Sequence, residues 1–147
     1  MESLYLEWSG IKNIEQVVAA KSLMMLHIGS SQSLQSISPL SDMKQLKWLG
    51  LEAVTKISSL VPLTTLENLE GLSVEGSMWT TQRVDSLAPI GGLREIKYLA
   101  ITNLRSRDGT LEPLFALKKL KVFFAAKWWD ESEVATIVQN NPGVITN

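Results

Sequence analysis

The sequence predicts an α/β solenoid, a stack of short similar units with a curved parallel sheet of about six short strands on its concave face. Two observations carry this prediction. Leucine accounts for 22 of the 147 residues, and four of the five prolines are followed by the same spacing of apolar residues. Within each unit the apolar period changes from three residues to two, which indicates a turn that leads into a strand.

The repeat is clearest after Pro39, Pro62, Pro89 and Pro113, and an earlier copy has Gln16 in the proline position. From this position to the last apolar residue of the unit is always 12 residues, whereas the return to the next unit takes 10 to 15. The constant length indicates a defined geometry, and the variable length indicates a loop that tolerates insertions. The copy after Pro39 has its apolar residues at Leu40, Met43, Leu46, Leu49 and Leu51.

Each part of the unit predicts one structural element. Apolar residues at every third position predict 3₁₀ or short helical turns on the convex side. The closing alternation predicts a strand with its apolar residues pointing inward. One unit cannot bury its apolar edge alone, but stacked units share a continuous core. We therefore expect a single domain with repeats at about 1–23, 23–46, 46–69, 69–96, 96–120 and 120–128, and a C-terminal cap at 129–147.

The segment Leu46-x-x-Leu49-x-Leu51 resembles the core of the leucine-rich repeat, and the preceding turn is similar to the internalin and SDS22-like subclass with repeats of about 22 residues. The resemblance covers about residues 1–127. The family usually has an asparagine three residues after the last leucine, where it forms a buried hydrogen-bonded ladder. Here that position holds Ser9, Ser31, Val54, Ser77, Leu104 and Trp128. Because Val and Leu cannot bond to loop backbone, irregular return loops are expected.

The two ends of the stack differ in sequence. Asp130 is a candidate helix N-cap with an acid, Glu133, three residues later, and residues 140–143 (Asn-Asn-Pro-Gly) end the predicted capping helix. Trp128 and Trp129 are expected to help this helix seal the last repeat.

The N-terminal end enters a strand at Leu4-Tyr5-Leu6 almost at once. Tyr5 and Trp8 could cap the first repeat, or the chain could be the C-terminal portion of a longer solenoid, which we favour. A dimer that covers this end is a third possibility for an otherwise monomeric chain.

Outward strand positions form columns on the concave face. The first column contains Trp48 and Tyr98, and small residues such as Gly71 are expected to leave a depression between them. The third column contains Glu52 and Glu75, an acidic edge suited to Lys or Arg on a partner. Exposed aromatic side chains of this kind are typical of protein interfaces. The candidate partner-binding residues are Tyr5, His27, Trp48, Glu52, Glu75, Trp79, Tyr98 and Phe124.

Trp79 is included because the sheet is small. Six strands at about 4.8 Å span only about 24 Å, which makes it hard to bury the roughly 800 Å² per partner of a stable complex. The partner should therefore also contact loops, the longest of which (75–83) carries Trp79 and Arg83. As the structural alternative, Trp79 folds back on the core and the outward aromatics only stabilise neighbouring strands. His27 is then a neutral ring packed between Tyr5 and Gly50, with no acid in a neighbouring outward position.

Composition excludes several functions. A net charge of −1 argues against nucleic-acid or acidic-lipid binding, and the absence of Cys with a single His leaves few metal ligands. Phosphate-binding and nucleophile-elbow motifs are missing. Glu52 and Glu75 could form a glycosidase-like pair or a weak cation site, but a shallow sheet offers no deep cleft. We expect no enzyme activity and no cofactor.

The predicted function is non-enzymatic recognition of a protein or peptide through the concave face, with no nucleic-acid or membrane partner. The acidic edge suits a basic partner. The alternatives are a structural segment of a longer leucine-rich array and an intracellular inhibitor of the immunity type. Neither a signal peptide nor an apolar run of about 20 residues is present, so cytoplasmic location is the default. A secreted protein with its signal removed would look the same.

Overall fold

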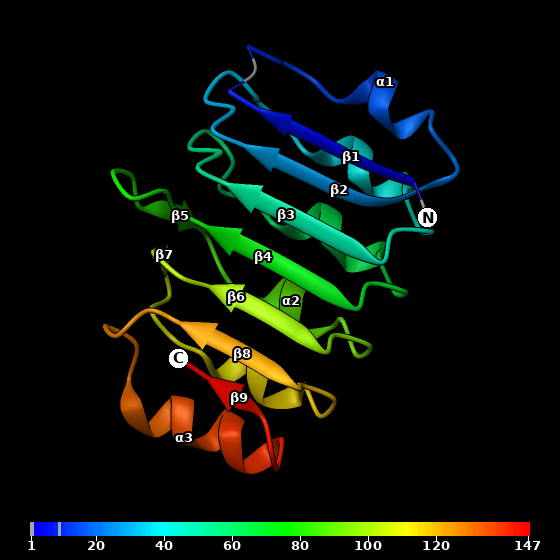
Figure 1. The fold of residues 1–147 in the computed structure, drawn as a ribbon. Coiled ribbons are helices and arrows are strands. Elements are labelled where there is room, and N and C mark those ends of the chain that lie inside the picture. The colour runs from blue at the N-terminus through cyan, green and yellow to red at the C-terminus, as the bar shows by residue number, and fades with distance from the viewer. Residues whose placement is uncertain (1, 9) are drawn as a thin grey trace.

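The computed structural model describes residues 2–8 and 10–147 and contains a seven-stranded parallel sheet. The strands lie side by side in the order β1-β2-β3-β4-β6-β8-β9, and short helices lie behind them (Figure 1). This arrangement confirms the predicted α/β solenoid. The strands are β1 (Glu2–Glu7), β2 (Leu23–Gly29), β3 (Trp48–Glu52), β4 (Gly71–Glu75), β6 (Tyr98–Ile101), β8 (Val122–Ala125) and β9 (Ile145–Thr146).

The turns behind the sheet are 3₁₀ or short α-helical, as predicted. Each of the four that contains a proline has it in the first turn, where the missing N–H removes no helical bond. The three-residue apolar period reflects i to i−3 bonding: the Leu40 N–H donates to the Ile37 carbonyl and that of Leu63 to the Leu60 carbonyl, both at 2.9 Å. The turns are α1 (Glu15–Val18), η1 (Ser38–Asp42), η2 (Val61–Thr65), α2 (Ala88–Gly91) and η3 (Glu112–Ala116).

The apolar ladder fills the core in every unit that has a proline. From Leu40 to Leu51, for example, no ladder side chain is more than 2% exposed. The first unit departs from the prediction, because its ladder residues Val17 and Ala20 are only partly buried. This unit has an α-helical turn without proline, and it buries Val18 in place of Val17.

The return loops are more ordered than predicted. β5 (Gln82–Val84) and β7 (Leu104–Ser106) form a second, two-stranded parallel sheet. Gln82 is fully buried, and its side-chain amide donates to the carbonyls of Val54 (3.4 Å) and Ile57 (2.8 Å). A glutamine from a later unit therefore bonds to the loop backbone that Val54 cannot satisfy. Among the residues that replace the family asparagine, Ser9 lies outside the described residues.

A left-handed corner follows four strands of the main sheet. Trp8, Ser30, Ala53 and Asn103 have φ of 51°, 50°, 49° and 48°. The N–H of Ser30 donates to the Glu52 carbonyl at 2.8 Å, and that of Ala53 donates to the Glu75 carbonyl at 2.9 Å. The chain thus leaves successive strands at the same level, so the residues just before the corners form an aligned row.

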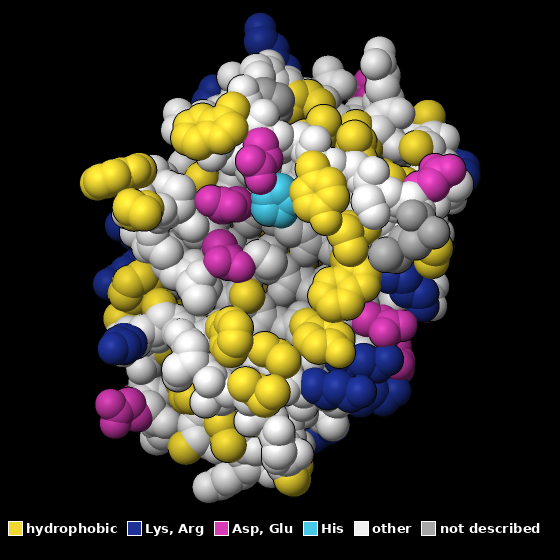
Figure 2. Space-filling view, in the orientation of Figure 1, with side chains coloured by type: hydrophobic (Ala, Val, Ile, Leu, Met, Phe, Trp, Pro, Cys, Tyr) yellow, Lys and Arg dark blue, Asp and Glu magenta, His cyan; other side chains and the backbone are white. Residues whose placement is uncertain are grey.

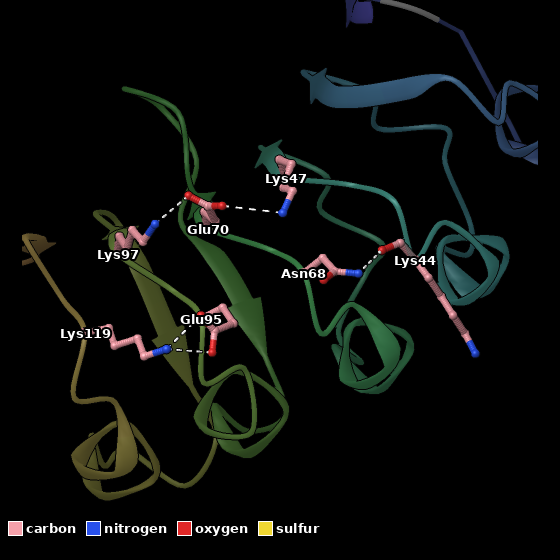
Figure 3. A network of polar contacts seen from close by, with 7 residues as sticks. All are labelled: Lys44, Lys47, Asn68, Glu70, Glu95, Lys97 and Lys119. Carbon is pink, nitrogen blue, oxygen red and sulfur yellow. Dashed lines mark hydrogen bonds and ion pairs between the residues drawn. The ribbon is translucent and has the colours of Figure 1, made fainter. Parts of the chain in front are cut away.

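Ion pairs join the amino ends of three strands. The Glu70 carboxylate lies between Lys97 Nζ, at 2.8 Å, and Lys47 Nζ, at 3.5 Å, and Lys119 bonds to Glu95 beside them (Figure 3). The hydrogen bond and charge of Lys97, followed by those of Lys47, hold the pKa of Glu70 below its ordinary value. The same Glu70 contact raises the pKa of Lys97.

A helix covers the C-terminal end of the core. α3 (Glu131–Asn140) begins as predicted at Asp130, whose carboxylate accepts from the N–H groups of Ser132 (2.8 Å) and Glu133 (3.1 Å). The Glu133 carboxylate accepts from Leu111 N–H at 2.9 Å, so it ties the helix to the preceding turn. Strand β9, which follows the helix, was not predicted, because its two exposed residues show no apolar alternation.

The two tryptophans before α3 have different environments. Trp129 is 6% exposed and seals the core as expected, whereas Trp128 is 43% exposed. The Trp128 indole N–H donates to the Leu104 carbonyl at 3.1 Å, and the Arg105 guanidinium lies 4.6 Å from the ring centre. Trp128 therefore packs on the return loops and not on the sealed end.

At the opposite edge, β1 pairs with β2 and with no other described strand. Tyr5 is 62% exposed and Trp8 is 84% exposed, so neither covers the apolar side chains of this edge. The self-capping that we considered from the sequence is not observed. Leu4 and Leu6 are correspondingly only partly buried.

Candidate functional site

The outward columns are in the predicted register. In the first column, Met25 lies opposite Trp48, Trp48 opposite Gly71, and Gly71 opposite Tyr98. In the third column, Gly29 lies between Glu7 and Glu52, and Glu52 lies opposite Glu75. The central column runs through Tyr5, His27, Gly50, Ser73, Ala100 and Phe124.

A hollow of about 370 Å³ lies over the middle of the sheet face. Figure 2 shows it between apolar side chains on one side and the histidine with acidic side chains on the other. We call it the sheet-face hollow. Its outward-pointing lining residues are Tyr5, Met25, His27, Trp48, Gly50, Gly71, Ser73, Tyr98, Ala100, Val122 and Phe124.

The sequence predicts a depression between Trp48 and Tyr98, and this prediction is wrong. Their rings stack, with centroids 5.0 Å apart and planes at 29°. This contact crosses an intervening strand and is possible because that strand presents Gly71, where a Cβ would lie 2.0 Å from the Trp48 ring. The two rings therefore form one wall of the hollow. Its floor is formed by the small residues of the central column, Gly50, Ser73 and Ala100.

His27 lies over Gly50, where a Cβ would be only 2.4 Å from Nδ1, and its ring centre is 5.9 Å from that of Tyr5. This agrees with the prediction of a packed ring. No acid lies directly opposite His27, as predicted, but two acids one strand and one column away reach its ring. Nε2 is 3.6 Å from Oε1 of Glu7 and 3.9 Å from Oε2 of Glu52. Both side chains reach this nitrogen from either side of Gly29, which offers no side chain to separate them.

The third acid has different partners. The Glu75 carboxylate accepts from the hydroxyls of Thr102 and Ser73. We call Glu7, Glu52 and Glu75 the acidic strip. Within residues 2–8 and 10–147, no Lys or Arg forms an ion pair with the strip. The strip therefore has unneutralised negative charge at the rim of an apolar hollow.

Trp79 does not fold back on the core: it is 89% exposed, and its neighbour Met78 is 86% exposed. The loop that carries them is held by Asn103, whose amide donates to the carbonyls of Ser77 (2.6 Å) and Thr80 (3.0 Å). Sequence reasoning missed Asn103 and Met78. The signal for Asn103 was its position at a corner, since asparagine tolerates positive φ.

A second hollow, of about 600 Å³, lies between this loop and the corners after β1, β2 and β3. Glu52 lines this hollow, and Gly50, two residues earlier on β3, lines the sheet-face hollow. We call this second hollow the loop groove. Its lining residues are Trp8, Gly10, Ser30, Gln32, Ser33, Glu52, Ala53, Ser77, Met78 and Trp79.

Other site chemistry is limited in the described part of the chain. No group of three His, Asp or Glu side chains there could hold a metal ion. No helix among the described residues combines the length and apolar character needed to span a membrane.

Similarity to known proteins is seen in structure and not in sequence. No protein-family model and no curated protein matches the sequence. Internalin C2 of Listeria monocytogenes superposes with a TM-score of 0.66 at 22% identity, over 98% of this chain and 69% of that one. A second internalin of the same organism, InlF, gives 0.65 at 18% identity, over 98% of this chain and 46% of that one. The chain thus has a leucine-rich repeat fold that is similar to the fold of the internalins.

Proposed function

We propose that the exposed sheet face is a recognition site for a protein or peptide segment and that the chain performs no covalent chemistry. The observation that carries this proposal is the sheet-face hollow beside the acidic strip. An apolar floor and wall, next to carboxylates that have no Lys or Arg partner among the described residues, combine a place for an apolar side chain with a place for a cation.

Contacts within the chain hold one wall of the hollow in place. The stacked rings of Trp48 and Tyr98 restrain each other, and the Tyr5 hydroxyl donates to the Met25 sulfur at 2.9 Å. Binding therefore has little side-chain entropy to lose at this wall, which favours affinity from a small contact area. Trp and Tyr at the centre of such a face are the side chains that most often dominate binding free energy.

The test is selection from a displayed library of random peptides on the immobilised protein. We expect enriched peptides that bind the wild type and lose binding to Ala100→Trp, which fills the hollow from an outward strand position. Ala135→Trp is the matched control, because Ala135 is exposed on α3. Circular dichroism and thermal unfolding check that both variants are folded.

Two results would contradict this function. If no peptide is enriched, the alternative of a structural segment within a longer array is favoured. If enriched peptides bind Ala100→Trp as well as the wild type, the site lies elsewhere on the molecule.

A further inference from the structure

The sheet-face hollow and the loop groove are neighbours along β3, and we call them, together with the acidic strip, the track. Gly50 lines the hollow and Glu52, two residues later, lines the loop groove, so the acidic strip lies at the boundary between them. A chain that lies along the strands would cross the hollow first, then the strip, and then the loop groove. The floor of the track changes from apolar to acidic to apolar.

No described residue covers the apolar side chains of the loop groove. Trp8, Met78 and Trp79 are 84%, 86% and 89% exposed, and all three line this groove. Exposed apolar side chains gathered in this way mark interaction sites. The bonds from Asn103 to Ser77 and Thr80 hold the loop in place, so its ordering upon binding costs little.

The middle of the track selects for positive charge. Among the described residues, the side-chain partners of its three carboxylates are His27 and the hydroxyls of Ser73 and Thr102. A Lys or Arg side chain placed over Glu52 and Glu75, which lie opposite each other on adjacent strands, gains two carboxylate partners, whereas an acidic side chain would be repelled.

The spacing of the track matches an extended peptide. The central and third columns are two residues apart on each strand, about 6.6 Å, and the corner residue follows directly. Side chains on one face of an extended ligand repeat at the same interval of about 6.6 Å. Two alternate side chains of one segment can therefore lie over the hollow and the strip, and the next one extends past the corner residues toward the loop groove.

We infer that the partner is an extended segment of the form apolar-x-Lys/Arg-x-apolar, with its apolar ends in the sheet-face hollow and between Trp8 and Trp79 and its cation on Glu52 and Glu75. This inference rests on the proposed function and adds the chemistry of the ligand. Nucleic acid does not fit the same track, because phosphates would face the acidic strip.

The same peptide selection tests the inference, followed by fluorescence anisotropy with synthetic peptides. The reference probe is the capped peptide Leu-Ser-Arg-Ser-Trp, and its variants replace Arg by Glu or Trp by Ser. We expect enriched library peptides to share the pattern, and the Arg-to-Glu peptide to bind at least about tenfold more weakly than the reference.

Protein variants assign each contact. Glu52→Gln with Glu75→Gln should weaken the reference peptide about tenfold and reduce its dependence on salt. Trp79→Ser should weaken the reference peptide about fivefold but leave the peptide that ends in Ser unchanged. Glu67→Gln and Val61→Ala, exposed outside the track, are the matched controls.

The outcomes separate the two proposals. Suppose that the enriched peptides lose binding to Ala100→Trp. If they also lack a Lys or Arg, or bind Trp79→Ser as well as the wild type, this inference is overturned and the proposed function remains. It is also overturned if the reference peptide shows no binding at a protein concentration of about 1 mM. A Kd of about 1 mM corresponds to a binding free energy of about −4 kcal/mol. An absence of enriched peptides overturns both.

Discussion

The two ends of the stack are built from similar repeats but are packed differently. At the C-terminal end, Phe123, Trp129 and Ile137 are 1%, 6% and 0% exposed. At the β1 edge, Leu4 and Leu6 are only partly buried. A repeat in a solenoid contacts only its neighbours, so its contribution to stability depends on what is stacked on each side. The same leucine position is therefore expected to differ in energetic weight from one end to the other.

The ends also differ in polar contacts. Asn141, buried after α3, accepts from Leu120 N–H at 2.8 Å and donates to the Leu117 and Ile137 carbonyls, both at 2.9 Å. Asn147 bonds to both backbone groups of Ala125 at 3.0 Å and so continues the sheet ladder. At the C-terminal end, asparagine side chains therefore bond to the backbone of the last repeat. At the other end, β1 pairs with one described strand, β2.

The largest expected effect is at the covered end. Ile137→Ala removes the buried side chain by which α3 packs on the core, which should lower the free energy of unfolding by about 2–5 kcal/mol. Leu6→Ala at the β1 edge should cost only about 1 kcal/mol, because Leu6 is already partly exposed. Urea unfolding followed by circular dichroism measures both. Equal losses would contradict the contrast between the two ends.

The next effect concerns Asn141. Asn141→Ala leaves the buried N–H of Leu120 and the Leu117 carbonyl without their side-chain partner, which should cost about 1–3 kcal/mol. Asn141→Asp keeps an acceptor for Leu120 but removes the donor to Leu117, so it should restore only part of this. Hydrogen exchange at Leu120 provides a local measurement. Unchanged protection of Leu120 in Asn141→Ala would argue against this role.

A pH-dependent effect is expected at the start of α3. The Ser132 hydroxyl and the N–H groups of Glu133 and Ser132 hold the pKa of Asp130 below its ordinary value. A carboxyl with a lowered folded-state pKa stabilises fully above its unfolded pKa of about 3.9, and this is lost as pH falls through the folded value. The stability advantage of wild type over Asp130→Asn should therefore be constant near pH 6 and shrink below about pH 4. A difference that grows on acidification would refute this linkage.

The smallest effect is expected at the exposed edge. Trp8→Asn should change the free energy of unfolding by less than about 0.5 kcal/mol, since the indole is 84% exposed and Asn103 adopts the same backbone conformation. Thermal unfolding checks this. A loss of several degrees would mean that Trp8 stabilises the first unit after all.

The repeat allowed much of the architecture to be predicted from the sequence. The apolar spacing of the repeat placed every strand of the main sheet except β9, and it put Trp48 in register with Gly71 and Tyr98. These are backbone properties, and a backbone that repeats can be extrapolated from one unit to the next.

Side-chain reach could not be extrapolated in this way. Trp48 crosses a strand to stack on Tyr98, and Glu7 and Glu52 converge on His27 across Gly29. Each arrangement depends on a glycine in the adjacent unit, where the repeat itself places no constraint. Gln82 was missed for a similar reason, because its side chain bonds to residues of an earlier unit, 25 and 28 positions away in the sequence.

The Lys47–Glu70–Lys97 ion pairs also affect the order in which strands assemble. Repeats of similar sequence can mispair during folding by skipping a unit. If β3 paired with β6 and left out β4, Lys47 would lie beside Lys97 without the carboxylate that separates them. Like charges on neighbouring strands disfavour that arrangement. The alternating charges therefore distinguish one leucine-rich unit from the next. They favour the native strand order β3-β4-β6 over a sheet in which β4 is left out.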